Sequence, residues 1–258
     1  MNRRTFLKGV PALTVLAAAS PGLTEDANTA PGSARDANTA FSSTLDLQPI
    51  TLVKPETDGG KSVLAALQAR RTIRNISSKE LAPQALSNLL WAAWGVNRQS
   101  GPFGHLGRTA ASASNSQEMD LYVVLPEGVY LYEAVGHRLS PVIAGDLRGK
   151  VGAHGRRDVM VKAPVILIFV VDIAKYSKSP FQEPGLKDLE IQKSYYNVAT
   201  GLIAGNVYLF AASQGLAAWF HNCNKAGLAS ELKLRPEQRV LYAQTVGFPA
   251  LSGIEGPA

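Results

Sequence analysis

Residues 108 to 124 read Arg-Thr-Ala-Ala-Ser-Ala-Ser-Asn-Ser-Gln-Glu-Met-Asp-Leu-Tyr-Val-Val, a small polar stretch that becomes apolar and β-branched. The pattern predicts a loop that leads into a strand. Such a loop can bring backbone groups and short side chains close to a flat ligand. Asn115 is its most informative residue, because one carboxamide offers both a hydrogen-bond donor and an acceptor. The alternative interpretation is a turn residue that bonds its own backbone.

The rest of the chain alternates predicted helices and strands. Ala163–Ile173 is an almost continuous apolar run, which predicts a central strand that is buried on both faces. The other predicted strands are Leu121–Leu125, Val129–Glu133, Gly215–Asn222 and Val240–Pro249. Apolar periodicity predicts helices over Ser62–Arg70, Leu81–Val96 and Lys193–Gln214. Leu139–Lys150 is predicted as a loop followed by a short helix, and Lys225–Pro236 contains another short helix. This order predicts an α+β domain.

Composition and charge narrow the function classes. The chain has 258 residues, 46% of them hydrophobic and 18% charged, which allows one sizeable core. Removing three N-terminal basic residues from a net charge of +6 leaves +3, and no basic block interleaved with aromatic residues supports nucleic-acid binding. The single cysteine, Cys223, excludes an intrachain disulfide, and the four scattered histidines lack metal-ligand spacing. We therefore expect no nucleic acid and no metal.

The first 45 residues resemble an export segment. Arg3-Arg4-Thr5-Phe6-Leu7-Lys8 is a twin-arginine pattern, followed by a short apolar run and by Ala17-Ala18-Ala19. Residues 1–19 therefore predict a signal peptide, with a frayed terminus and a chance arginine pair as the alternative. The run is too short to span a bilayer, so we expect no stable membrane anchor. Residues 20–45 predict a disordered linker before a domain over 46–258, and the protein is expected in the periplasm or cell envelope.

Three arginines and a hydroxyl follow the first predicted helix, in the segment Arg70-Arg71-Thr72-Ile73-Arg74. A guanidinium binds phosphate oxygens through two parallel hydrogen bonds, and Thr72 can donate another. The alternative is a solvated basic helix end that complements the helix dipole. Spacing alone leaves both interpretations open.

Four further groups of residues have an ordinary structural interpretation. Trp91 and Trp94 are expected in the core or at a subunit interface, and His221 and Cys223 are expected to be packed rather than reactive. The segment Lys175–Lys187 is either a lid or, the safer interpretation, a surface loop. Lys193, Tyr195 and Tyr196 are interpreted as a helix entrance.

In order, three segments make the chain similar to the nitroreductase superfamily of FMN-dependent oxidoreductases. Arg70–Arg74 resembles the family's Arg-x-Ser-x-Arg/Lys phosphate segment. Arg108–Gln117 resembles its Pro-Ser-x-x-Asn-x-Gln segment, with Ala111 in place of the usual proline. Residues 89–98, Leu-Leu-Trp-Ala-Ala-Trp-Gly-Val-Asn-Arg, resemble the branch that includes flavin dehydrogenases of peptide-borne azolines.

The resemblance implies a mostly antiparallel central sheet flanked by helices, an interlocked homodimer, and one FMN in each subunit-interface pocket. It implies hydride transfer between flavin N5 and a small organic substrate, with an electron donor that the sequence does not identify. The implied cofactor-binding residues are Arg70, Arg71, Thr72, Arg74, Ser112, Ser114, Asn115 and Gln117. No catalytic side chain is implied, although the azoline branch uses a Lys-Tyr pair, which leaves Lys193, Tyr195 and Tyr196 as an open alternative.

Two other functions remain open from the sequence. One is a dehydrogenase of a peptide or natural-product heterocycle, and the other is an exported protein that binds flavin or a partner without turnover. One departure bears on both. Many family members carry Lys or Arg after the closing Gly-x-Pro, whereas residues 250–258 contain neither. The phosphate site is then expected to depend on Arg70, Thr72 and Arg74, with Arg235 as a further contributor.

Overall fold

A computed structural model describes residues 47–101, 104–152 and 162–250. These residues belong to one compact unit. The predicted signal peptide at 1–19 and the predicted linker at 20–45 lie outside the described residues. Within the described part, no helix combines the length and apolar character needed to cross a membrane.

The described residues form a seven-stranded sheet with the order β1-β6-β5-β4-β7-β9-β8, in which every neighbouring pair is antiparallel. A separate two-stranded ribbon joins β2 and β3. The strands of the large sheet are β1 (Ile50–Thr51), β4 (Met119–Leu125), β5 (Gly128–Glu133), β6 (Arg138–Ala144), β7 (Val165–Asp172), β8 (Ala217–His221) and β9 (Gln238–Gly247); those of the ribbon are β2 (Val96–Arg98) and β3 (Gly107–Arg108).

The central strand β7 is buried along its whole length, as its apolar run predicts. Successive side chains of a strand point to opposite faces of the sheet. Leu167 and Phe169 therefore pack in the core that contains α2 and α5, whereas Ile166 and Ile168 pack in the core that contains α3 and α6. Both faces of the sheet are covered, which explains a continuous apolar run in an antiparallel sheet.

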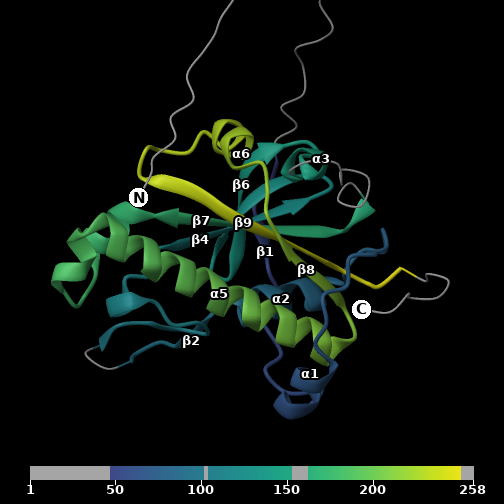
Figure 1. Cartoon of the computed structure of the whole chain (residues 1–258). Helices are drawn as coiled ribbons and strands as arrows, with labels where there is room; N and C mark the ends of the chain where they lie inside the picture. Colours follow the sequence, from purple (N-terminus) through teal and green to yellow (C-terminus); the bar gives the residue numbers. More distant parts are fainter. Residues whose placement is uncertain (1–46, 102–103, 153–161, 251–258) are drawn as a thin grey trace, which may run out of the picture. The chain divides into compact units, whose positions relative to one another are not determined.

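Figure 1 shows the helices distributed over the two faces of this sheet. Helices α2 and α5 cover one face, with α1 packed beside α5, and the short helices α3 and α6 cover the other. The α-helices are α1 (Val63–Ala69), α2 (Pro83–Trp94), α3 (Arg148–Val151), α5 (Leu189–Gln214) and α6 (Lys225–Glu231), and the 3₁₀ helices are η2 (Ala113–Asn115), η3 (Ile173–Lys178) and η4 (Pro184–Lys187). The predicted α+β fold, with a large antiparallel sheet flanked by helices, is confirmed.

The long helix α5 begins four residues before the predicted start. The Asp188 carboxylate accepts hydrogen bonds from the backbone N–H groups of Glu190 and Ile191, and so caps the helix at Leu189. The helix ends at Gly215, whose φ of 69° is readily adopted by a residue without a Cβ. As a result, Lys193, Tyr195 and Tyr196 lie inside the helix rather than at its entrance.

One predicted element is wrong. Residues 139–144 were expected in a loop but belong to β6, and only Arg148–Val151 is helical. Pro141 has no backbone N–H to donate, so it weakens the sequence signal of a strand. The strand tolerates it beside Tyr130, next to a register irregularity in the β5–β6 pairing.

Candidate functional site

The arginine segment runs from the end of α1 to the free edge of β8. Arg70 is the C-terminal cap of α1, and its backbone N–H donates to the carbonyl of Ala66. Three residues later, the backbone N–H of Ile73 donates to the carbonyl of Ala218 in β8 at 3.0 Å. These two contacts hold the intervening residues between the helix and the sheet.

Tyr208 of α5 organises the side chains of this segment. Its hydroxyl accepts a hydrogen bond from the backbone N–H of Phe220 at 2.8 Å and shares a second hydrogen bond with Thr72 Oγ1 at 3.1 Å. The Arg70 guanidinium carbon lies 5.5 Å from the centre of the Tyr208 ring, a cation–π distance. Arg71 and Arg74 are exposed, and in the part of the chain that the structure describes neither side chain has a hydrogen-bond or ion-pair partner.

The second predicted segment, Ser112–Gln117, forms a tight loop around η2. Ser114, Asn115 and Gln117 all have positive φ angles, of 50°, 53° and 48°, which non-glycine residues seldom adopt. Local hydrogen bonds hold this backbone, since Ser112 Oγ accepts from the Gln117 N–H at 3.0 Å. Such a concentration of strained backbone is typical of a ligand-binding loop rather than of a plain connection.

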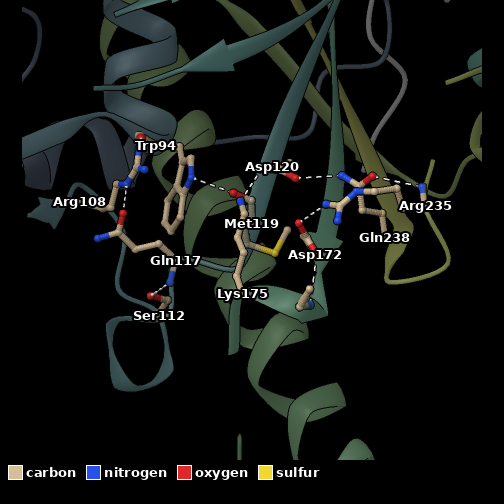
Figure 2. A network of polar contacts seen from close by, with 11 residues as sticks. Trp94, Arg108, Ser112, Gln117, Met119, Asp120, Asp172, Lys175, Arg235 and Gln238 are labelled. Atoms are coloured by element: carbon tan, nitrogen blue, oxygen red, sulfur yellow. Dashed lines mark hydrogen bonds and ion pairs between the residues drawn. The ribbon is translucent and has the colours of Figure 1, made fainter. Parts of the chain in front are cut away.

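Residues outside the loop form side-chain hydrogen bonds with it on both sides. Arg108 Nε donates to Gln117 Oε1 at 2.6 Å (Figure 2), and Ser114 Oγ donates to Glu183 Oε1 at 3.1 Å. Ser179 Oγ donates to the Ser114 carbonyl at 2.5 Å. The segment Lys175–Lys187, interpreted from the sequence as a lid or a surface loop, thus contains η3 and η4 residues and contacts the Ser112–Gln117 loop from one side.

Two cavities lie along α5. One, of about 280 Å³, is bordered by Ser112 and Ala113 of the loop and by Tyr195, Val198 and Leu202 of the helix. The other, of about 330 Å³, lies between α1, α2 and α5 and is bordered by Trp91, Thr109 and Asn206 among others. Thr109 borders the second cavity, and its hydroxyl oxygen is buried without a hydrogen-bond partner among the described residues.

The two predicted segments contact α5 at different levels. The arginine segment contacts Tyr208, whereas the Ser112 loop borders a cavity with Val198, ten residues earlier. At about 1.5 Å per residue, these levels are roughly 15 Å apart along the helix axis. No hydrogen bond joins the two segments within the described ranges. In one chain the two predicted segments therefore contact the same helix at well-separated levels.

Arg235, the further phosphate candidate, lies elsewhere. Its guanidinium pairs with Asp172 at 2.6 Å (Figure 2), at the end of β7 that is remote from Val165. The arginine segment contacts Ala218, whose neighbour in β9, Val246, pairs with Val165. Seven residues of strand, at about 3.3 Å each, separate the two ends of β7. Arg235 is therefore not beside the arginine segment.

The Lys193–Tyr196 group splits into three environments. Lys193 is exposed and lies 3.8 Å from the Glu190 carboxylate. Tyr195 borders the cavity beside Ser112, and Tyr196 is buried in the main core. Only Tyr195 could therefore reach a ligand at the loop. Trp94 is buried, as expected, and its indole N–H donates to the Met119 carbonyl at 3.1 Å (Figure 2).

Four residues that border the candidate site were not predicted from the sequence: Arg108 as a contact of Gln117, Thr109, Glu183 and Tyr208. Their contacts join residues far apart in the chain, such as Thr72 and Tyr208 at a separation of 136. Arg108 alone carried a local signal, because it stands nine residues before Gln117 at the start of the quoted stretch.

Cys223 and His221 are buried and packed, as predicted. Burial raises the pKa of the Cys223 thiol to about 11, so the thiolate is scarce at neutral pH. His221 donates from Nδ1 to the Asn222 carbonyl at 2.8 Å, and its Nε2 accepts from the Thr245 hydroxyl at 2.9 Å. Burial lowers the pKa of His221. This imidazole is neutral in the fold.

Because of His221, the free energy of unfolding is expected to decrease as the pH is lowered. Its folded-state pKa lies below the unfolded value of about 6.5, so its contribution is present above pH 6.5 and is lost as the pH falls through the folded pKa. Between pH 7.5 and 5.5, the free energy of unfolding measured with denaturant should drop less in His221→Gln than in the unchanged protein. The exposed His105 provides the control, and an identical drop in His105→Gln and His221→Gln would contradict this origin.

Comparison with known proteins agrees with this arrangement. The nitroreductase family model matches residues 67–248, more than half of the chain. The chain belongs to the nitroreductase family. This family consists of oxidoreductases that generally bind a flavin, most often FMN. The matched range includes the arginine segment, the Ser112 loop and α5.

Individual relatives agree with the family assignment. A candidate nitroreductase of Methanocaldococcus jannaschii is 26% identical over 154 residues, which cover 57% of this chain and 71% of that protein. The crystal structure of a candidate nitroreductase from Ralstonia eutropha is 33% identical, covers 79% of this chain and 90% of its own, and has a TM-score of 0.69. A chain of the E. coli microcin synthetase McbBCD complex, 16% identical with a TM-score of 0.54 over 67% of this chain and 66% of its own, shares the fold.

Proposed function

We propose that this nitroreductase-family protein binds FMN and transfers hydride between flavin N5 and a small organic substrate. The observation that carries the proposal is the arginine segment. Residues 70–74 hold three arginines and Thr72 in one short stretch between α1 and β8, and the Arg71 and Arg74 side chains have no partner among the described residues. Three cations and a hydroxyl in so short a stretch are suited to a phosphate group.

The donor set fits FMN at both of its ends. Arg70, Arg74 and Thr72 would hold the phosphate, and the absence of basic residues from 250–258 leaves this role to them. Asn115 and the backbone of the Ser112 loop would contact the ring edge, where one N–H lies between two carbonyl groups. When bound, the flavin supplies the hydride chemistry, and the protein supplies position, electrostatics and protection from water.

A homodimer would bring the two halves of the site together. The surface formed by α1 and α5, here called the α1/α5 surface, exposes apolar side chains: Val63, Leu64, Leu67, Val198 and Leu202. The side chain of Leu64 is 78% exposed, and a Cβ placed at Gly201 or Gly205 would meet no atom within 4 Å. So many exposed apolar side chains on two helices that pack together favour burial against a second copy.

The positions of Gly201 and Gly205 indicate how the two α5 helices would cross in this dimer. Glycine leaves the backbone of α5 open to close approach by another helix. An antiparallel crossing centred between Gly201 and Gly205 would place residue 198 of one helix opposite residue 208 of the other. The Ser112 loop of one copy would then approach the arginine segment of its partner, and a two-fold dimer would hold two such sites.

No side chain is assigned as an acid or base in the proposed reaction, because hydride transfer at the flavin needs only close approach of the substrate. The apolar walls of the cavity beside Ser112, such as Val198 and Leu202, would exclude water from the reacting atoms. The twin-arginine pattern leads us to propose export of the folded protein to the periplasm or cell envelope, with an electron donor suited to that compartment.

The test is to purify the full chain and to measure flavin released on denaturation. One FMN per chain is expected, identified by its absorbance and by chromatography against FMN and FAD standards. The purified protein, reduced by dithionite without oxygen, should be reoxidised by a nitroaromatic acceptor faster than free reduced FMN. Colourless protein that cannot be reconstituted with FMN would refute all flavin functions. Bound FMN without faster reoxidation would favour the non-catalytic alternative.

A second candidate substrate class is a peptide-borne or natural-product heterocycle. Tyr195 favours it, because this tyrosine borders the cavity beside the Ser112 loop. Loss of contact with water and, second, the Glu183 carboxylate raise the pKa of Tyr195, so its hydroxyl keeps its proton. Residues 89–98 also resemble the azoline-oxidising branch. Oxidation of a synthetic thiazoline peptide with concomitant flavin reduction, lost in Tyr195→Phe, would support this candidate over nitro reduction.

A further inference from the structure

Three side chains at the base of the Ser112–Gln117 loop form a hydrogen-bonded chain that starts at Arg108, here called the amide relay. Arg108 Nε donates to Gln117 Oε1 at 2.6 Å (Figure 2), and Gln117 Nε2 donates to Asn115 Oδ1 at 3.1 Å. The Leu106 carbonyl accepts from both amides, from Gln117 Nε2 at 3.0 Å and from Asn115 Nδ2 at 3.1 Å. All four groups belong to the segment 106–117.

The relay has a fixed direction. A guanidinium can only donate hydrogen bonds, so the oxygen of the Gln117 amide must face Arg108. A backbone carbonyl can only accept, so the nitrogen atoms of both amides must face Leu106. If either amide turned over, two acceptors or two donors would meet. Asn115 is therefore held in one of its two orientations, with one N–H and one oxygen lone pair left for a ligand.

Arg108 is suited to set this direction. Its guanidinium lies 5.1 Å from the centre of the Trp94 ring, and Nη1 donates to the Trp94 carbonyl at 3.1 Å. Burial lowers its pKa, but an arginine stays charged at neutral pH. None of the ion pairs among the described residues includes Arg108. Arg108 therefore makes its direct side-chain contacts with neutral groups, among them the Gln117 amide.

We infer that Arg108 is a positioning residue for the flavin: through Gln117 it holds the Asn115 carboxamide in the orientation that recognises the flavin pyrimidine edge. This inference rests on the proposed FMN function. The fixed N–H would donate to a ring carbonyl, and the fixed oxygen would accept from the ring N–H. Each bond in the relay polarises the next, so the Arg108 charge strengthens the Asn115 donor and favours the reduced, negatively charged ring.

The test compares Arg108→Met, which has no donor, with Arg108→Lys, which keeps the charge and can donate to Gln117. Apo-protein of the full chain is titrated with FMN, with quenching of flavin fluorescence as the signal, and the midpoint potential of the bound flavin is measured. Arg108→Met should bind FMN about tenfold to a hundredfold more weakly and shift the midpoint potential to a more negative value. Arg108→Lys should restore both quantities most of the way.

Thermal unfolding of the apo-proteins separates positioning from a structural role. A lower melting temperature in Arg108→Met, with affinity and potential unchanged, would overturn the inference. If Arg108→Met does not fold, Gln117→Met interrupts the relay at its next link and carries the same expectation. If the protein without any substitution binds no FMN, the proposed function itself is contradicted. If that protein and Arg108→Met bind FMN with the same affinity, only this inference is contradicted.

Discussion

The double substitution Arg70→Ala with Arg74→Ala should yield protein that retains almost no FMN through purification. Each guanidinium is proposed to form a charge-assisted hydrogen bond with the phosphate, worth about 1.5–3 kcal/mol, so losing both should raise the dissociation constant about a hundredfold or more. Arg74 has no partner among the described residues, and Arg70 contacts only the Tyr208 ring. The thermal stability of the apo-protein should therefore change little. Flavin absorbance per chain and fluorescence titration measure the effect.

The matched control removes two basic residues elsewhere on the surface. Arg138 and Lys150 are exposed and pair with Glu133 and Glu231. Their double replacement by alanine lowers the net charge by the same amount, so it should leave FMN affinity unchanged. Equal losses in both double variants would indicate a general effect of charge. Full FMN retention by the Arg70, Arg74 variant would refute the phosphate site.

The substitution Leu202→Glu should convert a dimer into a monomer and release its flavin. Leu202 is 44% exposed on the α1/α5 surface, between Gly201 and Gly205 in the helix. A carboxylate there would be buried without a partner in the proposed interface, a cost of several kcal/mol that should weaken association about a thousandfold. Light scattering measures the molar mass, and absorbance of the same sample measures bound FMN.

Val135→Glu is the control for this substitution. Val135 is 66% exposed in the turn between β5 and β6, away from α1 and α5. The Val135→Glu substitution introduces the same charge on a surface that the proposed dimer does not bury. The molar mass and the flavin content should therefore stay unchanged. A Leu202→Glu protein that remains dimeric would exclude the α1/α5 surface as the interface. A monomer that keeps its FMN would show that one chain suffices for binding.

The elements with a strong local pattern were predictable from the sequence. Strand β7 was predictable from its continuous apolar run, because it is buried on both faces of the sheet. Helix α2 was predictable from its 3.6-residue apolar period, because it is buried on one face. Strand β6 escaped prediction because Pro141 interrupts its pattern, and because several of its side chains are exposed. The predicted start of α5 came too late in the chain, because its capping residue, Asp188, stands outside the apolar repeat that indicated the helix.

The candidate site was predictable only in its local segments. The arginines and Asn115 were recognisable by residue type and by family resemblance, and their role in cofactor binding stays a prediction. The contact of Thr72 with Tyr208 and that of Ser114 with Glu183 depend on tertiary packing across many residues, so they leave no sequence pattern. The positive φ angles of the loop also left no signal in the sequence, because they occur at Ser114, Asn115 and Gln117 rather than at glycines.

The bond from the Ile73 N–H to the Ala218 carbonyl has a consequence for solubility. Strand β8 is the last strand on its side of the sheet, and an uncovered outer strand is a template for strand addition between molecules. Residues 70–74 cross this outer strand and occupy one of its backbone acceptors. The segment proposed to bind the cofactor phosphate thus also helps to keep separate molecules from joining edge to edge, so the same few residues serve both cofactor retention and resistance to aggregation.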